Sequence, residues 1–209
     1  MKKAITLVLL VLSLSSCATL QQAKKPQYPQ QRVFVYSCDK KDAFTATFDK
    51  EKDLFYIEGF GGMRVLKHAL SASGARYVDG QMQYWSKGDN ATVEWKGNTY
   101  TCSIDWKKSY KADAKSRGLD YFAYDTDRSW MLDIKGDTLD FYTEDGMEKA
   151  SFEKAGIEKA RTVTVYKASN AGHKIEVVVG GDGKCHGRSV QADITYDEKK
   201  FLGCGDNLK

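Results

Sequence analysis

Two short polar segments near the middle of the chain carry a serine and a lysine whose side chains suit an acidic binding site. Ser73 lies in residues 71–74, and Lys87 lies in residues 85–89. A lysine ammonium is a compact cation with three hydrogen-bond donors, and a serine hydroxyl can donate or accept. Together the two groups could satisfy a pair of carboxyl groups in one cleft. Ser73 and Lys87 are therefore the first candidate binding residues.

Strand-like segments flank both loops. Residues 76–78, 82–85 and 91–95 are rich in aromatic and β-branched side chains, and the polar loops with glycine interrupt them. An antiparallel meander of these segments would place Ser73 and Lys87 on surface loops. Loops on a rigid β scaffold are where recognition residues usually lie.

The sequences SGARY at residues 73–77 and WSKGDNAT at residues 85–92, with Cys38 and Cys102 on either side, resemble the membrane-bound and periplasmic inhibitors of c-type lysozyme. The resemblance covers about residues 32–105 and implies a small eight-stranded barrel. In that family two loops enter the lysozyme cleft, where a serine hydroxyl and a lysine ammonium meet the two catalytic carboxyl groups. The resemblance assigns these roles to Ser73 and Lys87. It gives the further lysozyme-binding positions, which shape or flank the loops, as Gly74, Tyr77, Gly88 and Thr92.

Inhibition of this kind requires neither catalysis nor a cofactor in the chain. A lysozyme cleft is a preformed acidic site, because glycoside hydrolysis of this type needs one protonated and one ionised carboxyl group. The alternative is that Ser73 only shapes a turn and Lys87 is solvated, as most such residues are. The surrounding motifs favour the binding role.

The periodicity predicts an all-β protein. In the first part, short segments separated by turn signals every 8 to 12 residues indicate a small antiparallel barrel or sandwich. The eight expected strands there are residues 32–38, 43–48, 54–57, 63–70, 76–78, 82–85, 91–95 and 99–104. The expected strands in the second part are residues 121–124, 130–134, 138–142, 162–166, 174–179 and 190–196.

These patterns predict a barrel at residues 32–105, a linker with one or two helical turns at 106–117, and a second antiparallel β-rich domain at 118–209. The second part has thirteen Lys and Arg against seventeen Asp and Glu, whereas residues 32–108 have twelve against ten. It looks like an uncharacterised periplasmic β module often joined to the inhibitor domain. That likeness rests on residues 129–134, 185–189 and 201–205, and it implies no known activity.

The N-terminus predicts a lipid anchor. Residues 1–17 combine Lys2 and Lys3, a short apolar run and the sequence LSSC, which looks like a bacterial lipobox ending at Cys17. Such leaders are cut before the cysteine, which then carries acyl chains. Ala18 in place of Asp resembles outer-membrane lipoproteins, so we expect a lipid-anchored protein at the outer membrane facing the periplasm, with residues 18–31 as a tether. The alternative is an ordinary secretory signal with an incidental cysteine.

Four cysteines remain after Cys17, and an even number suits an oxidising compartment. They allow three pairings. We expect Cys38 with Cys102 and Cys185 with Cys204, because each pair then lies within one proposed domain. No C-x2-C spacing is present, so no metal site is expected.

Other chemistry is less well supported by the sequence. Cys185 followed by His186 could suggest a nucleophile, but a disulfide to Cys204 would block the thiol. The glycine-rich residues 180–184 lack the phosphate-loop pattern, and no basic-aromatic pattern indicates nucleic acid. Two alternatives to an inhibitor remain open. One is a structural or ligand-binding envelope lipoprotein without inhibitory activity, and the other is an envelope hydrolase that uses the second domain.

Overall fold

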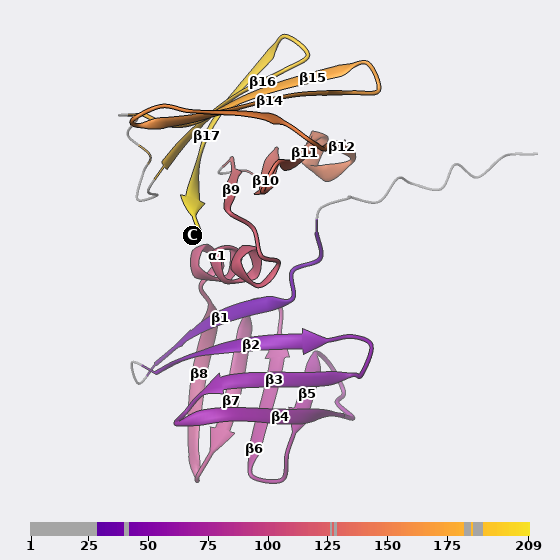
Figure 1. Cartoon of the computed structure of the whole chain (residues 1–209). Coiled ribbons are helices and arrows are strands. Elements are labelled where there is room, and N and C mark those ends of the chain that lie inside the picture. The colour runs from indigo at the N-terminus through magenta and orange to yellow at the C-terminus, as the bar shows by residue number, and fades with distance from the viewer. Residues whose placement is uncertain (1–28, 40–41, 126, 128, 182–184, 186–189) are drawn as a thin grey trace, which may run out of the picture.

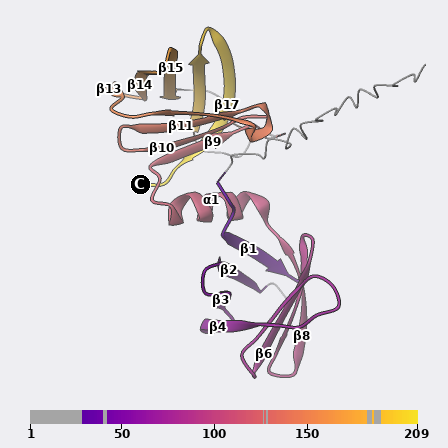
Figure 2. The ribbon, with the colours of Figure 1, turned by 90° about the vertical axis from the view of Figure 1, so that its right-hand side faces the viewer.

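A helix separates a β-barrel from a second β-sheet in the computed structural model of the chain (Figure 1). The structure describes residues 29–39, 42–125, 127, 129–181, 185 and 190–209. The leader, Cys17 and the tether up to residue 28 lie outside the described residues, as do His186 and residues 182–184. The turned view in Figure 2 also places α1 (Trp106–Ser116) between the barrel and the sheet.

Eight antiparallel strands close into the first barrel, each paired with its neighbour in sequence, and β1 pairs with β8. This confirms the predicted all-β fold and the eight-stranded barrel. Side chains alternate between solvent and an aromatic interior, where Tyr36 stacks on Phe44 at 4.8 Å and Phe55 lies 4.4 Å from Tyr84 between ring centroids. The strands are β1 (Val33–Cys38), β2 (Ala43–Asp49), β3 (Leu54–Gly59), β4 (Gly62–Ala69), β5 (Ala75–Val78), β6 (Met82–Lys87), β7 (Asn90–Trp95) and β8 (Asn98–Ile104).

Helix α1 completes the edge of β1 that β8 leaves unpaired. Strand β8 pairs only with the last three residues of β1. Beyond them the Ser109 hydroxyl accepts from the Val35 amide at 2.8 Å, and Asp113 Oδ1 accepts from the Arg32 and Val33 amides at 2.9 and 3.2 Å. The predicted linker is thus an eleven-residue helix packed along the barrel. Across the described residues, no helix has the length and apolar character needed to span a membrane.

Nine antiparallel strands form the second sheet, in the order β12-β11-β10-β9-β17-β16-β15-β14-β13. The sheet curls, so that Asn170 Nδ2 on β14 donates to the Ser151 carbonyl of β12 at 2.8 Å, and apolar side chains fill the interior. The strands are β9 (Tyr121–Tyr124), β10 (Met131–Lys135), β11 (Thr138–Thr143), β12 (Glu148–Phe152), β13 (Gly156–Lys159), β14 (Val163–Asn170), β15 (His173–Gly180), β16 (Val190–Tyr196) and β17 (Lys199–Asn207), with a 3-10 turn, η1 (Glu144–Gly146), between β11 and β12.

Arg117 connects the helix to the second sheet through two buried carboxylates. Its guanidinium pairs with Asp113 at 3.1 Å, one turn back on α1, and with Asp133 on β10. Because Asp113 also accepts from the amides of Arg32 and Val33 at the start of β1, one polar cluster joins the barrel, the helix and the sheet.

Each part of the fold carries one disulfide bond. Cys38 on β1 is bonded to Cys102 on β8, and Cys185 is bonded to Cys204 on β17. These are the two pairs expected from the sequence. The first joins the strands that close the barrel.

Candidate functional site

The pairing of β5 with β6 brings the two candidate loops to the same end of the barrel. Ala75 at the start of β5 lies opposite Ser86 near the end of β6. The loop that precedes β5 therefore lies beside the turn that follows β6. Ser73 and Lys87, fourteen positions apart in the sequence, belong to neighbouring loops in space.

Gly74 allows the Ser73 loop to lie close against β6. Its φ is +71°, and a Cβ atom on residue 74 would lie 2.0 Å from the Ser86 carbonyl oxygen. The Ser71 hydroxyl donates to the Gly74 carbonyl at 3.0 Å. The Ser73 side chain is exposed, and its hydroxyl makes no hydrogen bond to the described residues.

Lys87 projects from a tight hairpin. It pairs with Asn90 across the two-residue loop Gly88–Asp89, in which only Gly88 has positive φ, the pattern of a type II′ turn. The Lys87 side chain is exposed and has no ion pair among the described residues. Its ammonium group is therefore available to a partner.

Tyr77 lies on β5, which follows the Ser73 loop. It is only 7% exposed, and its ring stacks on Phe55 at 4.7 Å between centroids. Burial raises the pKa of Tyr77, and Asp53 adds to the shift. The ring therefore faces the barrel core, so Tyr77 flanks the Ser73 loop along the chain without presenting its ring to a partner. Thr92 is half-buried on β7, directly opposite Trp85.

Two further residues at this end were not singled out from the sequence. Trp85 is 43% exposed on β6, and its Nε1–H donates to the Ser73 carbonyl at 2.8 Å. Leu70, just before the Ser73 loop, is 93% exposed. A tryptophan on a strand beside a motif loop was the sequence signal that could have pointed to Trp85. Its hydrogen bond to Ser73 depends on the strand register.

The Lys87 turn also contacts helix α1. The Asp89 carboxylate accepts from Trp106 Nε1 at 3.0 Å, and the Asp89 carbonyl accepts from the Ile104 amide at 2.9 Å. Trp106 is the first residue of α1. The turn is therefore attached to both the end of β8 and the helix.

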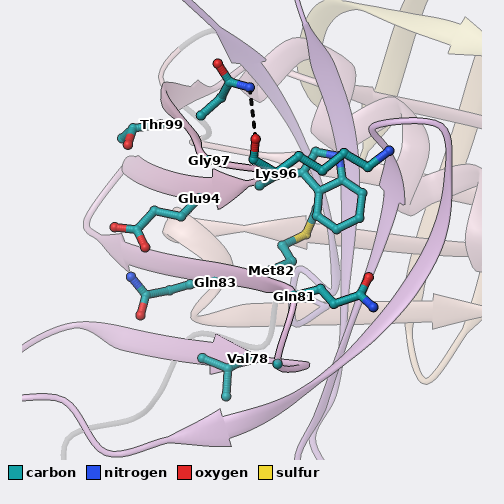
Figure 3. Close-up of a pocket in the computed structure, with 11 residues that line it drawn as sticks. Val78, Gln81, Met82, Gln83, Glu94, Lys96, Gly97 and Thr99 are labelled. Atoms are coloured by element: carbon teal, nitrogen blue, oxygen red, sulfur yellow. Dashed lines mark hydrogen bonds between the residues drawn. The ribbon is translucent and has the colours of Figure 1, made fainter.

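A groove of about 420 Å³ lies at the opposite end of the barrel, between the β5–β6 and β7–β8 turns (Figure 3). It is lined by polar side chains around Met82 and Trp95. The Arg64 guanidinium covers the Trp95 ring at 3.7 Å from its centroid. None of the predicted binding residues lines this groove.

The other chemistry considered from the sequence finds no support at the described positions. Cys185 is in a disulfide bond, so it has no thiol to act as a nucleophile. Within the described ranges, no group of three or more His, Cys, Asp or Glu side chains is placed to hold a metal ion.

Comparison with known proteins identifies the family to which the chain is related. Residues 36–101 match the family described as membrane-bound lysozyme inhibitor of c-type lysozyme. A protein named "Membrane-bound lysozyme inhibitor of C-type lysozyme" from Escherichia coli K12 is 37% identical over 93 residues, which cover 44% of this chain and 82% of that relative. Relatives with the same name from Cupriavidus necator and Pseudomonas aeruginosa are 30% and 32% identical, over 41% and 37% of this chain and 74% and 65% of their own lengths. With its closed barrel and paired motif loops, this chain belongs to the family of membrane-bound lysozyme inhibitors of c-type lysozyme.

Proposed function

We propose that this protein inhibits c-type lysozyme by inserting its two neighbouring loops into the active-site cleft. The observation that carries the proposal is the placement of Ser73 and Lys87 at one end of a disulfide-closed barrel, exposed and without partners among the described residues. The names of the relatives supply the class of partner. The protein acts as a binder, not as an enzyme.

The chemistry follows from the two carboxyl groups of the cleft. The Lys87 ammonium pairs with the ionised carboxylate, and the Ser73 hydroxyl hydrogen-bonds to the protonated carboxyl beside it. The tight backbone geometry at Gly74 and Gly88 fixes both loops before binding, which lowers the entropic cost of association. Occupation of the cleft then excludes the polysaccharide.

Anchoring completes the proposal. Cys17 carries the lipid, and multiple acyl chains at one site give stable attachment. Residues 18–31 hold the barrel away from the outer membrane on its periplasmic side. At that position the inhibitor protects peptidoglycan from lysozyme.

The test is a titration of c-type lysozyme activity on cell walls with the soluble chain of residues 18–209 in which Cys17 is absent. We expect stoichiometric inhibition. Lys87→Ala should weaken it by at least about tenfold, since close charge pairs across another interface couple by about 1.5–7 kcal/mol. Ser73→Ala should weaken it by about 2- to 10-fold, as expected for one hydrogen bond.

Lys96→Ala is the matched control, because Lys96 is an exposed lysine in the turn at the opposite end of the barrel. It should inhibit like the wild type. A folded wild-type chain that does not inhibit would instead favour the structural or ligand-binding envelope lipoprotein.

A further inference from the structure

We propose that Trp106 of helix α1 is a positioning residue for the Lys87 turn, so that the helix that follows the barrel takes part in inhibition. The proposal rests on the proposed function. Trp106 lies beyond residues 36–101, the part of the chain that matches the family. The inference therefore gives a role to a segment that the family match does not cover.

Two hydrogen bonds hold the turn, one from helix α1 and one from the end of β8 just before it. Trp106 Nε1 donates to Asp89 Oδ2 at 3.0 Å, and the Ile104 amide donates to the Asp89 carbonyl at 2.9 Å. Asp89 is the second residue of the two-residue turn that presents Lys87. Its side chain is thus fixed to the first residue of α1, and its backbone to the last residue of β8.

Trp106 is held in place by other aromatic rings. Its ring lies 6.1 Å from Phe34 on β1 in an edge-on arrangement and 5.5 Å from Tyr110 one turn along the helix, and Tyr110 lies 5.2 Å from Tyr124 on β9. A continuous series of contacts runs from the turn through α1 to the second sheet. The helix is itself bonded to β1 through Ser109.

This arrangement controls where the negative charge of Asp89 lies. Asp89 is two residues from Lys87, close enough for its carboxylate to approach the ammonium if the side chain were released. Held by Trp106, the carboxylate is turned toward the helix, and Lys87 has no ion pair among the described residues. Trp106 therefore keeps the lysine charge available for a partner's carboxylate.

The test is a double-mutant cycle of Trp106→Phe and Asp89→Asn in the chain of residues 18–209. Phenylalanine keeps an aromatic ring and removes the indole N–H. Trp106→Phe should weaken inhibition by about 2- to 10-fold, the range of one hydrogen bond. In the Asp89→Asn background the same substitution should cause little further loss, because the competing charge is gone. Amide hydrogen exchange at residues 88 and 89 of the free protein should be faster in Trp106→Phe.

Lys111→Ala is the control on the same helix. Lys111 pairs with Asp206 on β17 at 3.0 Å and does not touch the turn, so its removal should leave inhibition unchanged. An equal loss of inhibition from Trp106→Phe in both backgrounds would mean a general packing role and would overturn the proposal. The proposal would also be overturned if Trp106→Phe inhibited lysozyme as strongly as the wild type and its amides at residues 88 and 89 exchanged at the wild-type rate. A wild-type chain that does not inhibit would overturn the proposed function itself, and the exchange rates would then still show whether Trp106 holds the turn.

Discussion

At residue 74 the backbone adopts a conformation that favours glycine, in a space too small for a side chain. Residue 74 has a φ of +71°, and a Cβ atom there would lie 2.0 Å from the Ser86 carbonyl oxygen. Gly74→Ala must therefore move the Ser73 loop away from β6. We expect a loss of about 1–3 kcal/mol in the free energy of unfolding, together with weaker inhibition. Chemical denaturation and a lysozyme titration measure the two effects.

Gly80→Ala separates crowding from backbone strain. Gly80 also has a positive φ, +87°, but a Cβ atom at residue 80 would have no other atom within 4 Å. Gly80→Ala should lower the free energy of unfolding by only about 1 kcal/mol. It should leave inhibition intact, since residue 80 lies at the far end of the barrel. Equal effects of the two substitutions would show that the close approach at Gly74 is unimportant.

Trp85 fixes the Ser73 loop by a single side-chain hydrogen bond. Trp85→Phe removes the Nε1–H that donates to the Ser73 carbonyl at 2.8 Å. We expect inhibition to weaken by about 2- to 10-fold with a small change in stability, because the bond is exposed. Unchanged inhibition would show that the loop keeps its position without Trp85.

At the scale of elements, helix α1 supplies hydrogen-bond acceptors to backbone amides of β1, as a neighbouring strand would. The hydroxyl of Ser109 is buried and accepts from the Val35 amide. Ser109→Ala leaves that amide without its partner, so we expect a loss of about 1–3 kcal/mol in the free energy of unfolding.

Ser103→Ala is the comparison for Ser109, because Ser103 is exposed on β8 in the same barrel. It should change stability by less than about 0.5 kcal/mol. Urea unfolding followed by tryptophan fluorescence gives both values. A loss at Ser109 no larger than at Ser103 would contradict the structural role of the helix.

The periodicity of the sequence predicted the barrel strands and six strands of the sheet, but it understated α1. Among the buried residues of that helix are Ser109 and Asp113, whose hydrogen-bonding partners lie far away in the sequence. Helix α1 therefore has only a weakly apolar face, although an apolar face is the usual sequence sign of a packed helix. Only the folded barrel shows why these polar side chains are buried.

Three strands of the second sheet were not predicted, each for a local reason. Strand β13 is exposed at every position, and the short edge strand β12 has one buried residue, so neither shows a clear alternation. Strand β17 contains Gly203 and Gly205, and glycine is unfavourable in the interior of a strand. In the structure a Cβ at these positions would lie 2.3 Å from the Trp130 ring and 2.0 Å from the Phe122 carbonyl. The glycines are there because neighbouring rings and backbone pack directly against the strand.

The candidate site was predictable only in part. The resemblance selected Ser73 and Lys87, and the order of the strands placed their loops together. The bonds from Trp85 to Ser73 and from Trp106 to Asp89 depend on strand register and on the path of α1. Neither could be predicted from spacing along the chain.

At the scale of the whole molecule, buried tyrosines predict a loss of stability in alkali. Tyr36 and Tyr84 share a hydrogen bond of 2.7 Å in the barrel core, and Tyr142 is buried in the sheet. Burial raises the pKa of all three phenols above the ordinary value of 10.0. The folded state then holds these protons more tightly than the unfolded chain, so their contribution is complete below about pH 10 and is lost as the pH rises further.

Equilibrium unfolding in urea at pH 8 through 11 measures this effect. The free energy of unfolding should be level at first and fall above about pH 10. Tyr36→Phe, which cannot ionise, should reduce the slope. A level free energy of unfolding up to pH 11 would contradict the assignment.

The central claim, that the loops occupy the lysozyme cleft, is tested most directly by competition. The affinity of the soluble chain for c-type lysozyme would be measured by calorimetry with increasing amounts of a chitin oligosaccharide that fills the same cleft. If the loops enter the cleft, the apparent Kd should rise linearly with the free saccharide concentration and without a plateau, because only one of the two ligands can be bound. An unchanged Kd at saturating saccharide would show that the chain binds elsewhere on lysozyme and would contradict the account.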